Sequence, residues 1–401
     1  MALVPDITCE PEYPDTAGEE LGTGTPADIS EDDARLIRES FSHVAADPDA
    51  AMEHFYARLF VRNPEIRSMF PHTMRDHMGR VFAALTHIVE NVGSPDSLTC
   101  YLEQMGRSHR KFGVKGRHYE PLLTELAETV RYFSGHYWTG ETQAAWEAAL
   151  ARVSAVMTAA ADGDAARQPC WWTAEVVEHD RRGPNLAVLT VRPDQPLHYR
   201  PGQYLAVQVP RWPRVWRNFS VANAPRENGL IDLHVRAVPG GMVSGSLVHN
   251  MQPGDTLLLG QAQGELAARA DPERDLLCIA GGTGLAPIKA IIEGIIGQGG
   301  RRRKIGLFLG ARTEDDLYDL RELQALESAC PALTVIPVVS DQPNFGGIKG
   351  MVPDVAALHA NCEGRDVFIS GPEGMIAETV RLLESRVSAD RIHYDPPGAA
   401  R

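Results

Sequence analysis

The chain has 401 residues, 43% of them hydrophobic, and a formal net charge of −14. This length exceeds what one ordinary hydrophobic core holds, so we expect two or three domains. The acidic balance argues against nucleic acids and anionic membranes as partners, because both call for a basic face. No apolar run reaches membrane-spanning length and the N-terminus lacks a signal-peptide pattern, so we expect a cytoplasmic protein without a membrane span.

The six cysteines are scattered along the chain and include no Cys-x-x-Cys pair. They therefore predict neither a disulfide framework nor a thiolate metal site. Cys278 lies in an apolar run, where we expect it to be a small buried hydrophobic residue.

The first part of the chain predicts a tail followed by helices. Residues 1–29 are rich in Pro, Gly, Thr and acidic residues without periodicity, and we expect a disordered acidic tail. Ser30 and Asp33 then form a capping-box pattern, a hydroxyl followed three residues later by an acid. From there the apolar residues recur at helical spacing as far as Ala161. We expect an all-helical domain over residues 30–165, with a polar linker over 162–169.

The rest of the chain predicts two domains that contain strands. Over residues 170–270 the apolar period is two, and the expected strands cover 172–178, 186–192, 203–209, 217–222, 230–237 and 256–260. Short strands at this spacing are typical of an antiparallel β-barrel. Over residues 271–401 strand-like runs alternate with amphipathic helices, the runs being 276–280, 305–310, 333–339, 366–370 and 391–395. This alternation predicts an α/β domain with a parallel, doubly wound sheet.

The run Arg217-Asn218-Phe219-Ser220 lies on one of the barrel strands. A flavin needs donors for its pyrophosphate, a planar wall for its ring and a hydrogen-bonding partner for N5. Arg217 meets the first need, Phe219 or Tyr204 the second, and Ser220 the third. The alternative interpretation is an ordinary barrel strand.

Gly241, Val243 and Ser244 form a second candidate phosphate cradle, because a glycine pair precedes the expected start of a helix there. A hairpin with two glycines is the alternative. A third glycine turn follows the apolar run 276–280 and consists of Gly282, Thr283, Gly284, Leu285, Ala286 and Pro287. A strand–turn–helix of this kind brings backbone close to a pyrophosphate, and Ser370, Gly371 and Pro372 repeat the arrangement after another strand.

The charged residues near the third domain's second strand bear on which dinucleotide is used. The basic run 301–304 precedes this strand, whereas ribose-reading residues usually follow it, so a solvated basic turn is the preferred interpretation. After the strand, Arg312 is followed by Glu314, Asp315 and Asp316. One arginine against three acids leans toward NADH, and NADPH stays open as the alternative.

In the helical part, His109 lies near the end of a helical stretch and His77 lies on a separate helix. A lone histidine among fourteen is usually a surface or core residue. A helical domain joined to a flavin module, with two histidines facing each other, is also a place for haem, whose iron takes an axial imidazole. Both interpretations are open on these residues alone.

The motifs together resemble a known family. Residues 170–398 resemble a ferredoxin–NADP-reductase-type module, through Arg200-Pro-Gly-Gln-Tyr204, the Arg217 to Ser220 run and the two glycine turns. Residues 30–165 resemble the globin domain of flavohaemoglobins, through the segments His54 to Phe60, Asn63-Pro64-Glu65, Phe70 and the spacing of His109, Phe112 and Tyr119. The resemblance implies three cofactors, haem b, FAD and NADH or NADPH. It implies that Tyr204, Arg217, Asn218, Phe219 and Ser220 contact FAD, that 282–287 contact the nicotinamide cofactor, and that Ser370, Gly371 and Pro372 lie near the ring.

For the helical domain the resemblance implies a haem site. His109 is the expected proximal iron ligand, Tyr119 its hydrogen-bonding partner, and Tyr56 the distal hydroxyl that contacts bound oxygen. Phe70 is expected to pack on haem, and His77 falls where the family more often has Gln as a second distal donor. Without the resemblance, ordinary helix packing would be the preferred interpretation of Tyr56 and Phe70.

The sequence departs from the family at two places. The family has a Glu late in its last globin helix that hydrogen-bonds the proximal His, and Ala161 stands at that place. Without that hydrogen bond His109 donates less electron density to the iron, which is expected to raise the reduction potential of the iron. The family also ends with an aromatic residue over the flavin, whereas Pro396 follows Asp395 here, so the ring is either less shielded or covered by a residue such as Tyr394.

The resemblance predicts a nitric oxide dioxygenase that passes electrons from NAD(P)H through FAD to haem and acts on O₂ and NO. Three alternatives remain: a flavohaem oxidoreductase acting on an organic substrate, an O₂ or NO sensor with its own reductase, and a flavin reductase with an empty helical domain. We expect a monomer or a dimer.

Overall fold

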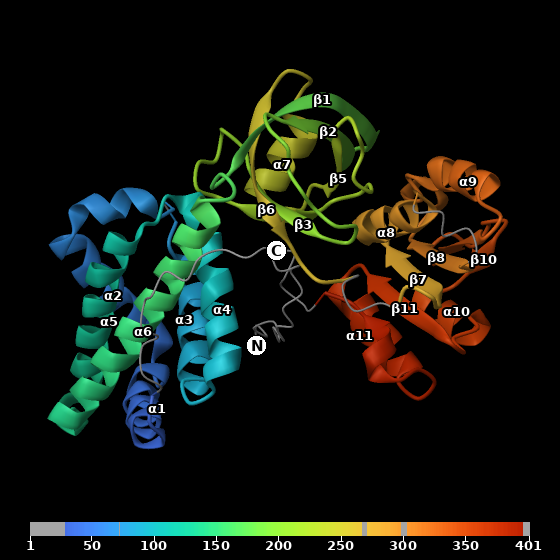
Figure 1. Cartoon of the computed structure of the whole chain (residues 1–401). Helices are drawn as coiled ribbons and strands as arrows, with labels where there is room; N and C mark the ends of the chain where they lie inside the picture. Colours follow the sequence, from blue (N-terminus) through green and yellow to red (C-terminus); the bar gives the residue numbers. More distant parts are fainter. Residues whose placement is uncertain (1–28, 72, 267–270, 298–302, 396–401) are drawn as a thin grey trace. The chain divides into compact units, whose positions relative to one another are not determined.

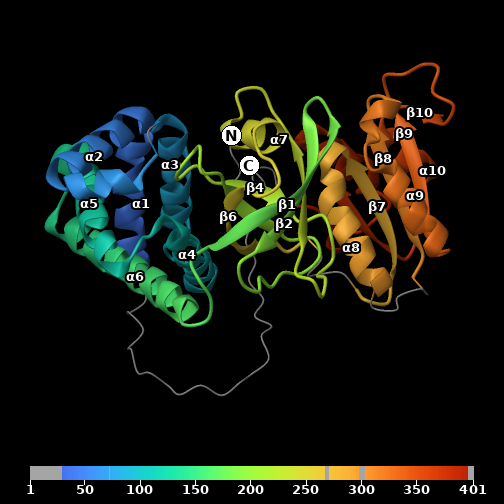
Figure 2. The ribbon, with the colours of Figure 1, turned by 90° about the horizontal axis from the view of Figure 1, so that it is seen from above.

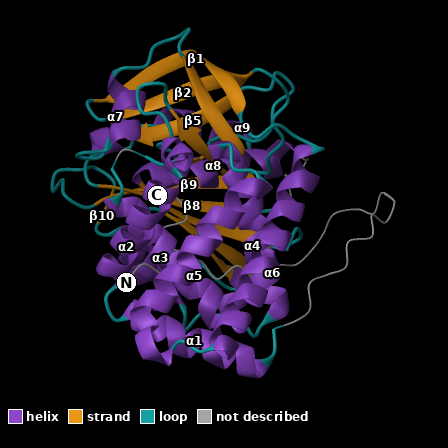
Figure 3. Ribbon diagram, turned by 90° about the vertical axis from the view of Figure 1, so that its left-hand side faces the viewer, coloured by secondary structure: helices purple, strands orange, loops and turns teal. Residues whose placement is uncertain are grey.

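The structure is a computed structural model that describes residues 29–71, 73–266, 271–297 and 303–395. They fall into two compact units, Met1–Cys170 and Trp171–Arg401. Figure 3 shows that the strands of the described residues all belong to the second unit. The predicted acidic tail lies outside the described residues except for Ile29, which packs against the helical core. Among the helices of the described residues, none combines the length and apolar character needed to cross a membrane.

The first unit is helical, as predicted (Figure 1). Its α-helices are α1 (Glu31–Ala45), α2 (Pro48–Arg62), α3 (Arg75–Glu90), α4 (Pro95–His109), α5 (Tyr119–Ser134) and α6 (Gly140–Ala165). Helix α1 begins where the capping pattern predicts, because the Ser30 side chain accepts a hydrogen bond from the Asp33 backbone N–H at 3.1 Å. Two apolar clusters fill the unit, one around Tyr56 and the other around Tyr119.

The predicted linker over 162–169 is wrong in its first half, because α6 continues through Ala165. The cause is Asp164, which is only 4% exposed. Its carboxylate is paired with Arg110 and also accepts a hydrogen bond from the Gln168 amide at 2.6 Å. A polar stretch that looked solvated in the sequence is therefore a helix end held by a buried ion pair.

The second unit begins with the predicted antiparallel barrel. Its strands are β1 (Trp172–Gly183), β2 (Leu186–Pro193), β3 (Tyr204–Gln208), β4 (Arg217–Ser220), β5 (Ile231–Arg236) and β6 (Thr256–Gln263). They pair in the order β4-β3-β6-β1-β2-β5. A bridge between Val221 and Leu233 joins the two outer strands, which closes the sheet. Helix α7 (Met242–His249) packs Val243 and Leu247 into the barrel core.

The parallel sheet that follows is also as predicted. Its strands are β7 (Asp275–Gly281), β8 (Ile305–Ala311), β9 (Leu333–Val339), β10 (Ile348–Lys349), β11 (Arg365–Ser370) and β12 (Ile392–His393), in the order β10-β9-β8-β7-β11-β12. Alternate residues of β7 face opposite sides: Cys278 lies in one apolar layer and Ile279 in the other. The first layer includes α8 (Leu285–Gly297) and α9 (Leu320–Ala329), and the second includes α10 (Val352–His359) and α11 (Glu373–Leu383).

Candidate functional site

Three predicted site residues of the helical unit meet in one aromatic cluster. Helix α2 carries Tyr56, the turn η1 (Pro64–Met69) leads to Phe70, and α3 carries His77. The ring centroid of Tyr56 is 5.6 Å from that of Phe70 and 5.8 Å from that of His77, and the Phe70 and His77 centroids are 5.3 Å apart. Residues separated in the sequence by a helix and a turn are thus brought together, as the resemblance implies.

The polar atoms of this cluster lie in an apolar environment. His77 Nε2 is buried and has no hydrogen-bond partner among the described residues. Burial lowers the pKa of His77 to about 4, and the nearby charge of Arg80 lowers it further. Burial likewise raises the pKa of the Tyr56 hydroxyl. At neutral pH the cluster therefore holds a neutral imidazole and an un-ionised phenol, and both groups can form hydrogen bonds without carrying charge.

His109 and Tyr119, the predicted proximal pair, lie close together. His109 is the last residue of α4, and its Nδ1 lies 3.3 Å from the Tyr119 hydroxyl at the start of α5. Burial lowers the pKa of His109 to about 4, with smaller contributions from Lys111 and His77. The imidazole is therefore neutral, which is the form that binds iron, and with Nδ1 next to Tyr119 the other nitrogen, Nε2, is available to a ligand.

The carboxylate that the family places near the proximal histidine is absent at Ala161. Asp164, the nearest buried acid on α6, pairs with Arg110 rather than with His109. Arg110 also donates to the Gln168 carbonyl at 2.7 Å. The sequence did not reveal this pairing, because Arg110 and Asp164 are far apart along the chain and either could have been a surface residue.

The residues of the helical unit fit a haem group. The fit rests on three observations. His109 is buried and neutral, the Nε2 atom of His77 has no hydrogen-bond partner among the described residues, and the apolar side chains of α3 are partly exposed. The apolar side chains along α3 are only half-buried although they border the two apolar clusters; they are Val81, Phe82, Leu85 and Ile88. A flat apolar group between α3 and α4 would complete their burial.

The predicted flavin strand is β4, at one end of the barrel's strand order. It pairs with β3 so that Ser220 is opposite Tyr204, and Arg217 is opposite Val207. All four residues from Arg217 to Ser220 are half-buried, so their side chains are partly accessible to a ligand. Gly264 packs closely on Tyr204, since a Cβ at this glycine would lie 3.0 Å from the tyrosine ring. The predicted residues are brought together on one part of the barrel.

The second predicted phosphate site, Gly241 to Ser244, presents mainly backbone N–H groups rather than side chains. Gly241 is the N-cap of α7, with no side-chain cap. Val243 is 1% exposed in the barrel core, and the Ser244 hydroxyl accepts from the Val238 N–H at 3.4 Å. The free N–H groups of the first helical turn are therefore the groups that could hold an anion.

The two glycine turns predicted for the nicotinamide cofactor touch each other. Gly282 to Gly284 form a short turn between β7 and α8, and a Cβ at Gly284 would lie within 2.5 Å of the Gly371 nitrogen. Gly282 has φ +54°, and a Cβ there would meet nothing within 4 Å. Strands β7 and β11 are neighbours at the point where the strand order reverses, which is where such sheets bind ligands. Leu285, Ala286 and Pro287 are buried, so these three offer backbone rather than side chains.

The acids predicted to favour NADH are partly engaged elsewhere. Asp316 pairs with Arg236 of the barrel at 3.4 Å and accepts from the Thr313 hydroxyl at 3.1 Å. At the C-terminal end, burial raises the pKa of Asp395 to about 6, and its charge acts on Tyr204. The residue proposed to cover the flavin, Tyr394, is 39% exposed.

Three segments of the chain match known families. Residues 53–157 match the globin family, residues 173–267 the oxidoreductase FAD-binding domain, and residues 278–381 the oxidoreductase NAD-binding domain. Among solved structures, a flavohemoglobin from Malassezia yamatoensis with bound FAD and heme covers 92% of this chain and 99% of its own, with a TM-score of 0.76 and 17% identity. That likeness is one of fold.

Curated relatives match the reductase part. The electron transfer component of xylene/toluene monooxygenase from Pseudomonas putida is 33% identical over 57% of this chain and 67% of its own length. The reductase component of a phenol 2-monooxygenase from a Pseudomonas species is 31% identical, and this chain covers 64% of it. An NAD(P)H-flavin reductase from Aliivibrio fischeri is 32% identical over 47% of this chain and 80% of its own. The chain thus spans about two thirds of the length of the two oxygenase relatives.

Fold, site and comparisons define a globin joined to an FAD- and NAD(P)H-binding oxidoreductase. The chain has the domain arrangement and the fold of a flavohaemoglobin, with a globin domain fused to FAD-binding and NAD-binding oxidoreductase domains. It is an NAD(P)H-dependent flavin oxidoreductase, and its globin domain implies small ligands of the O₂ and NO type.

Proposed function

We propose that the protein is a nitric oxide dioxygenase. One NAD(P)H would supply the two electrons with which two NO and two O₂ become two nitrate ions, with release of NAD(P)⁺ and one proton. The observation that carries this proposal is the pair of polar groups in the distal cluster, the Tyr56 hydroxyl and the unpartnered His77 Nε2. An aromatic cluster with two uncharged hydrogen-bonding groups suits a small polar diatomic ligand.

When bound, haem supplies an iron atom that takes diatomic ligands, and FAD accepts hydride and releases electrons singly. His109 would hold the haem, with Tyr119 fixing the direction of its ring. Tyr56 would donate its proton in a hydrogen bond to the distal ligand, and Phe70 would exclude water from it. On the reductase side, the turn at Gly282 would receive the dinucleotide and β4 the flavin.

The substitution Tyr56→Phe tests the proposal, because it keeps the ring in its aromatic cluster and removes only the hydroxyl. We expect nitrate formation from NO and O₂ to fall about 100-fold, as when one donor is taken from a preorganised site. The control is Tyr132→Phe, which removes a hydroxyl from an exposed tyrosine of the same unit. Reduction of ferricyanide by NADH should be unchanged in both variants. NADH consumption without nitrate in the unsubstituted protein would refute the proposal.

A second candidate function, oxygenation or reduction of an organic substrate, has support of its own. The relatives of the reductase part named above are electron transfer and reductase components of monooxygenases of xylene, toluene and phenol. The ion pair that Asp164 makes with Arg110 also leaves Tyr119 as the partner of His109, a weaker arrangement for oxygen chemistry than a carboxylate. A screen of NADH consumption with aromatic compounds in the absence of NO separates the two functions.

A further inference from the structure

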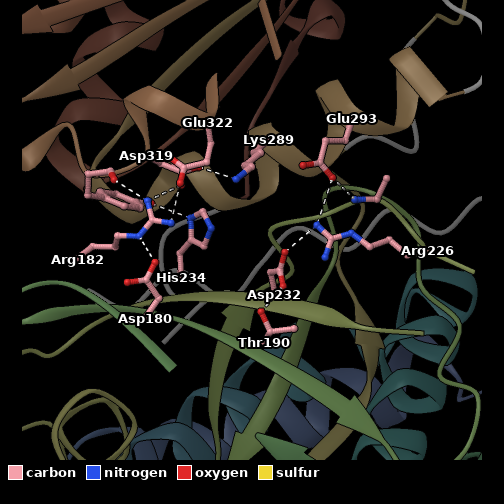
Figure 4. Close-up of polar contacts among 12 residues, drawn as sticks. Asp180, Arg182, Thr190, Arg226, Asp232, His234, Lys289, Glu293, Asp319 and Glu322 are labelled. Carbon is pink, nitrogen blue, oxygen red and sulfur yellow. Dashed lines mark hydrogen bonds and ion pairs between the residues drawn. The ribbon is translucent and has the colours of Figure 1, made fainter. Parts of the chain in front are cut away.

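Helix α8 carries two charged residues on the side that faces the barrel. It begins directly after the glycine turn, and Lys289 and Glu293 stand four residues apart, so they share one helix face. Figure 2 shows α8 between the barrel strands and β7 within the second unit. Glu293 contacts the barrel directly, and Lys289 reaches it through Asp319, which also pairs with Arg182 of the barrel (Figure 4).

The first contact is a buried cluster around Asp319. This carboxylate is 1% exposed and lies 2.6 Å from Lys289 Nζ and 3.5 Å from the Arg182 guanidinium of β1. Arg182 also pairs with Glu322 of α9 at 2.8 Å and donates to the Tyr318 carbonyl at 3.1 Å. Arg182 belongs to the barrel, whereas Asp319, Glu322 and Tyr318 belong to the parallel-sheet domain, so the cluster joins the two domains (Figure 4).

The second contact lies one helical turn further along α8. Glu293 accepts a hydrogen bond at 3.1 Å from the backbone N–H of Ala224, in the segment that follows β4. Arg226 of the same segment pairs with Asp232 of β5 at 2.8 Å and reaches Glu293 at 4.0 Å. Ala224 follows the flavin strand by only a few residues, so this contact connects α8 to the end of that strand.

The spacing of the two contacts has a geometrical consequence. One contact on a helix permits rotation about it, whereas two contacts on the same face fix both the direction of the helix and its rotation. The glycine turn is continuous with the start of α8, so its position relative to β4 is fixed as well. The charges are not exposed surface pairs of little energetic value, since Asp319 is fully buried and Lys289 is 13% exposed.

We propose that Lys289 and Glu293 are positioning residues for hydride transfer, which hold the dinucleotide turn at a fixed distance from the flavin strand. The proposal rests on the assignment of FAD to β4 and of NAD(P)H to the turn at Gly282. It does not depend on what happens at the haem. Neither residue touches a reacting atom; each acts through the helix that carries the turn.

The test is the rate at which NADH reduces the flavin. The full-length protein is mixed with NADH in an anaerobic stopped-flow instrument, and the loss of flavin absorbance is recorded. The variants are Lys289→Met, with Lys289→Arg as the control that keeps the charge, and Glu293→Ala, which removes the acceptor of the Ala224 N–H. Misplacement of reacting groups by about 1 Å costs up to about 100-fold in rate, so we expect the limiting rate to fall at least about tenfold in Lys289→Met. The dissociation constant of NADH should change little, because the turn itself is intact, and Lys289→Arg should restore most of the rate.

The matched control is Arg274→Met. It removes the arginine from an ion pair with Asp366, an acid that is also 1% exposed. The charged groups paired with Asp366 belong to the parallel-sheet domain, whereas Asp319 also pairs with Arg182 of the barrel. This variant should lose stability without losing the limiting rate. Equal limiting rates in Lys289→Met, Glu293→Ala and the unsubstituted protein would overturn the proposal. No flavin reduction by NADH in the unsubstituted protein would instead overturn the cofactor assignment, and loss of NO oxidation alone would leave the proposal standing.

Discussion

Arg110 pairs with the buried carboxylate of Asp164, and this pair connects the residue after His109 to the C-terminal end of α6. Both side chains are nearly inaccessible, at 10% and 5% exposure. The buried acid that lies nearest to Ala161 therefore serves the fold, and the Tyr119 hydroxyl is left to orient His109. The Arg110–Asp164 pair therefore has a structural role, and Tyr119 acts on His109. Each role can be tested by itself.

The substitution Asp164→Ala should destabilise the helical unit by about 3–5 kcal/mol, because it leaves the buried Arg110 without its partner. The measurement is urea unfolding of the full chain followed by haem absorbance, which reports on this unit. The double variant Arg110→Met with Asp164→Leu should recover most of the loss, since an apolar pair can replace a buried ion pair. Asp162→Asn, at an exposed position of the same helix, is the control. A single variant as stable as this control would show that the pair contributes little.

The substitution Tyr119→Phe should speed haem loss by about 10- to 100-fold, which is the usual cost of removing a group that orients a metal ligand. The measurement is the rate of haem transfer to an excess of apomyoglobin. Tyr101→Phe is a suitable control, because Tyr101 is a half-buried tyrosine of α4 whose ring lies against His87 rather than His109. Equal rates of haem loss in the two variants would remove Tyr119 from the proximal role.

Of the described strands, the sequence predicted all but the short β10, because alternation and turn residues are local properties. It also placed the two glycine turns at the ends of parallel strands, but their contact with each other is known only from the structure. It did not predict the contacts between barrel and parallel-sheet domain. Arg182 and Glu322 are 140 residues apart, and the sequence around each one is typical of an exposed charged residue. Asp316 is similar, because its pairing with Arg236 is visible only after folding.

His234 makes the stability of the second unit depend on pH. It is 4% exposed, its Nδ1 lies 2.9 Å from the Tyr318 hydroxyl, and burial lowers its pKa to about 3, with Lys289 and Arg182 adding to the shift and Asp232 and Glu322 opposing it. Since its ordinary pKa is 6.5, the unfolded chain binds a proton that the folded one does not as pH falls below that value. This contribution to stability is therefore complete above pH 6.5 and is lost progressively toward pH 3.

The loss from His234 should amount to at most about 1.4 kcal/mol per pH unit, the value for one proton. The measurement is the urea midpoint of the second unit between neutral and mildly acidic pH, followed by flavin fluorescence. His234→Gln keeps a hydrogen-bonding group beside Tyr318 but does not titrate, so its midpoint should fall less steeply. Parallel pH profiles of the two proteins would mean that other groups control acid unfolding.

Two glycines in the dinucleotide turn should respond differently to the same added methyl group. In Gly284→Ala the new Cβ would collide with the backbone of Ser370 and Gly371, so the turns at the ends of β7 and β11 must separate. We expect a marked loss of stability, measured as a lower urea midpoint. In Gly282→Ala the Cβ meets no protein atom within 4 Å, and the cost is the left-handed backbone at φ +54°, about 1–2 kcal/mol. That Cβ should instead occupy space needed by the pyrophosphate, so KM for NADH should rise by about tenfold or more while kcat changes less. Each variant is the control for the other: a rise in KM confined to Gly284→Ala would place the dinucleotide elsewhere than over Gly282.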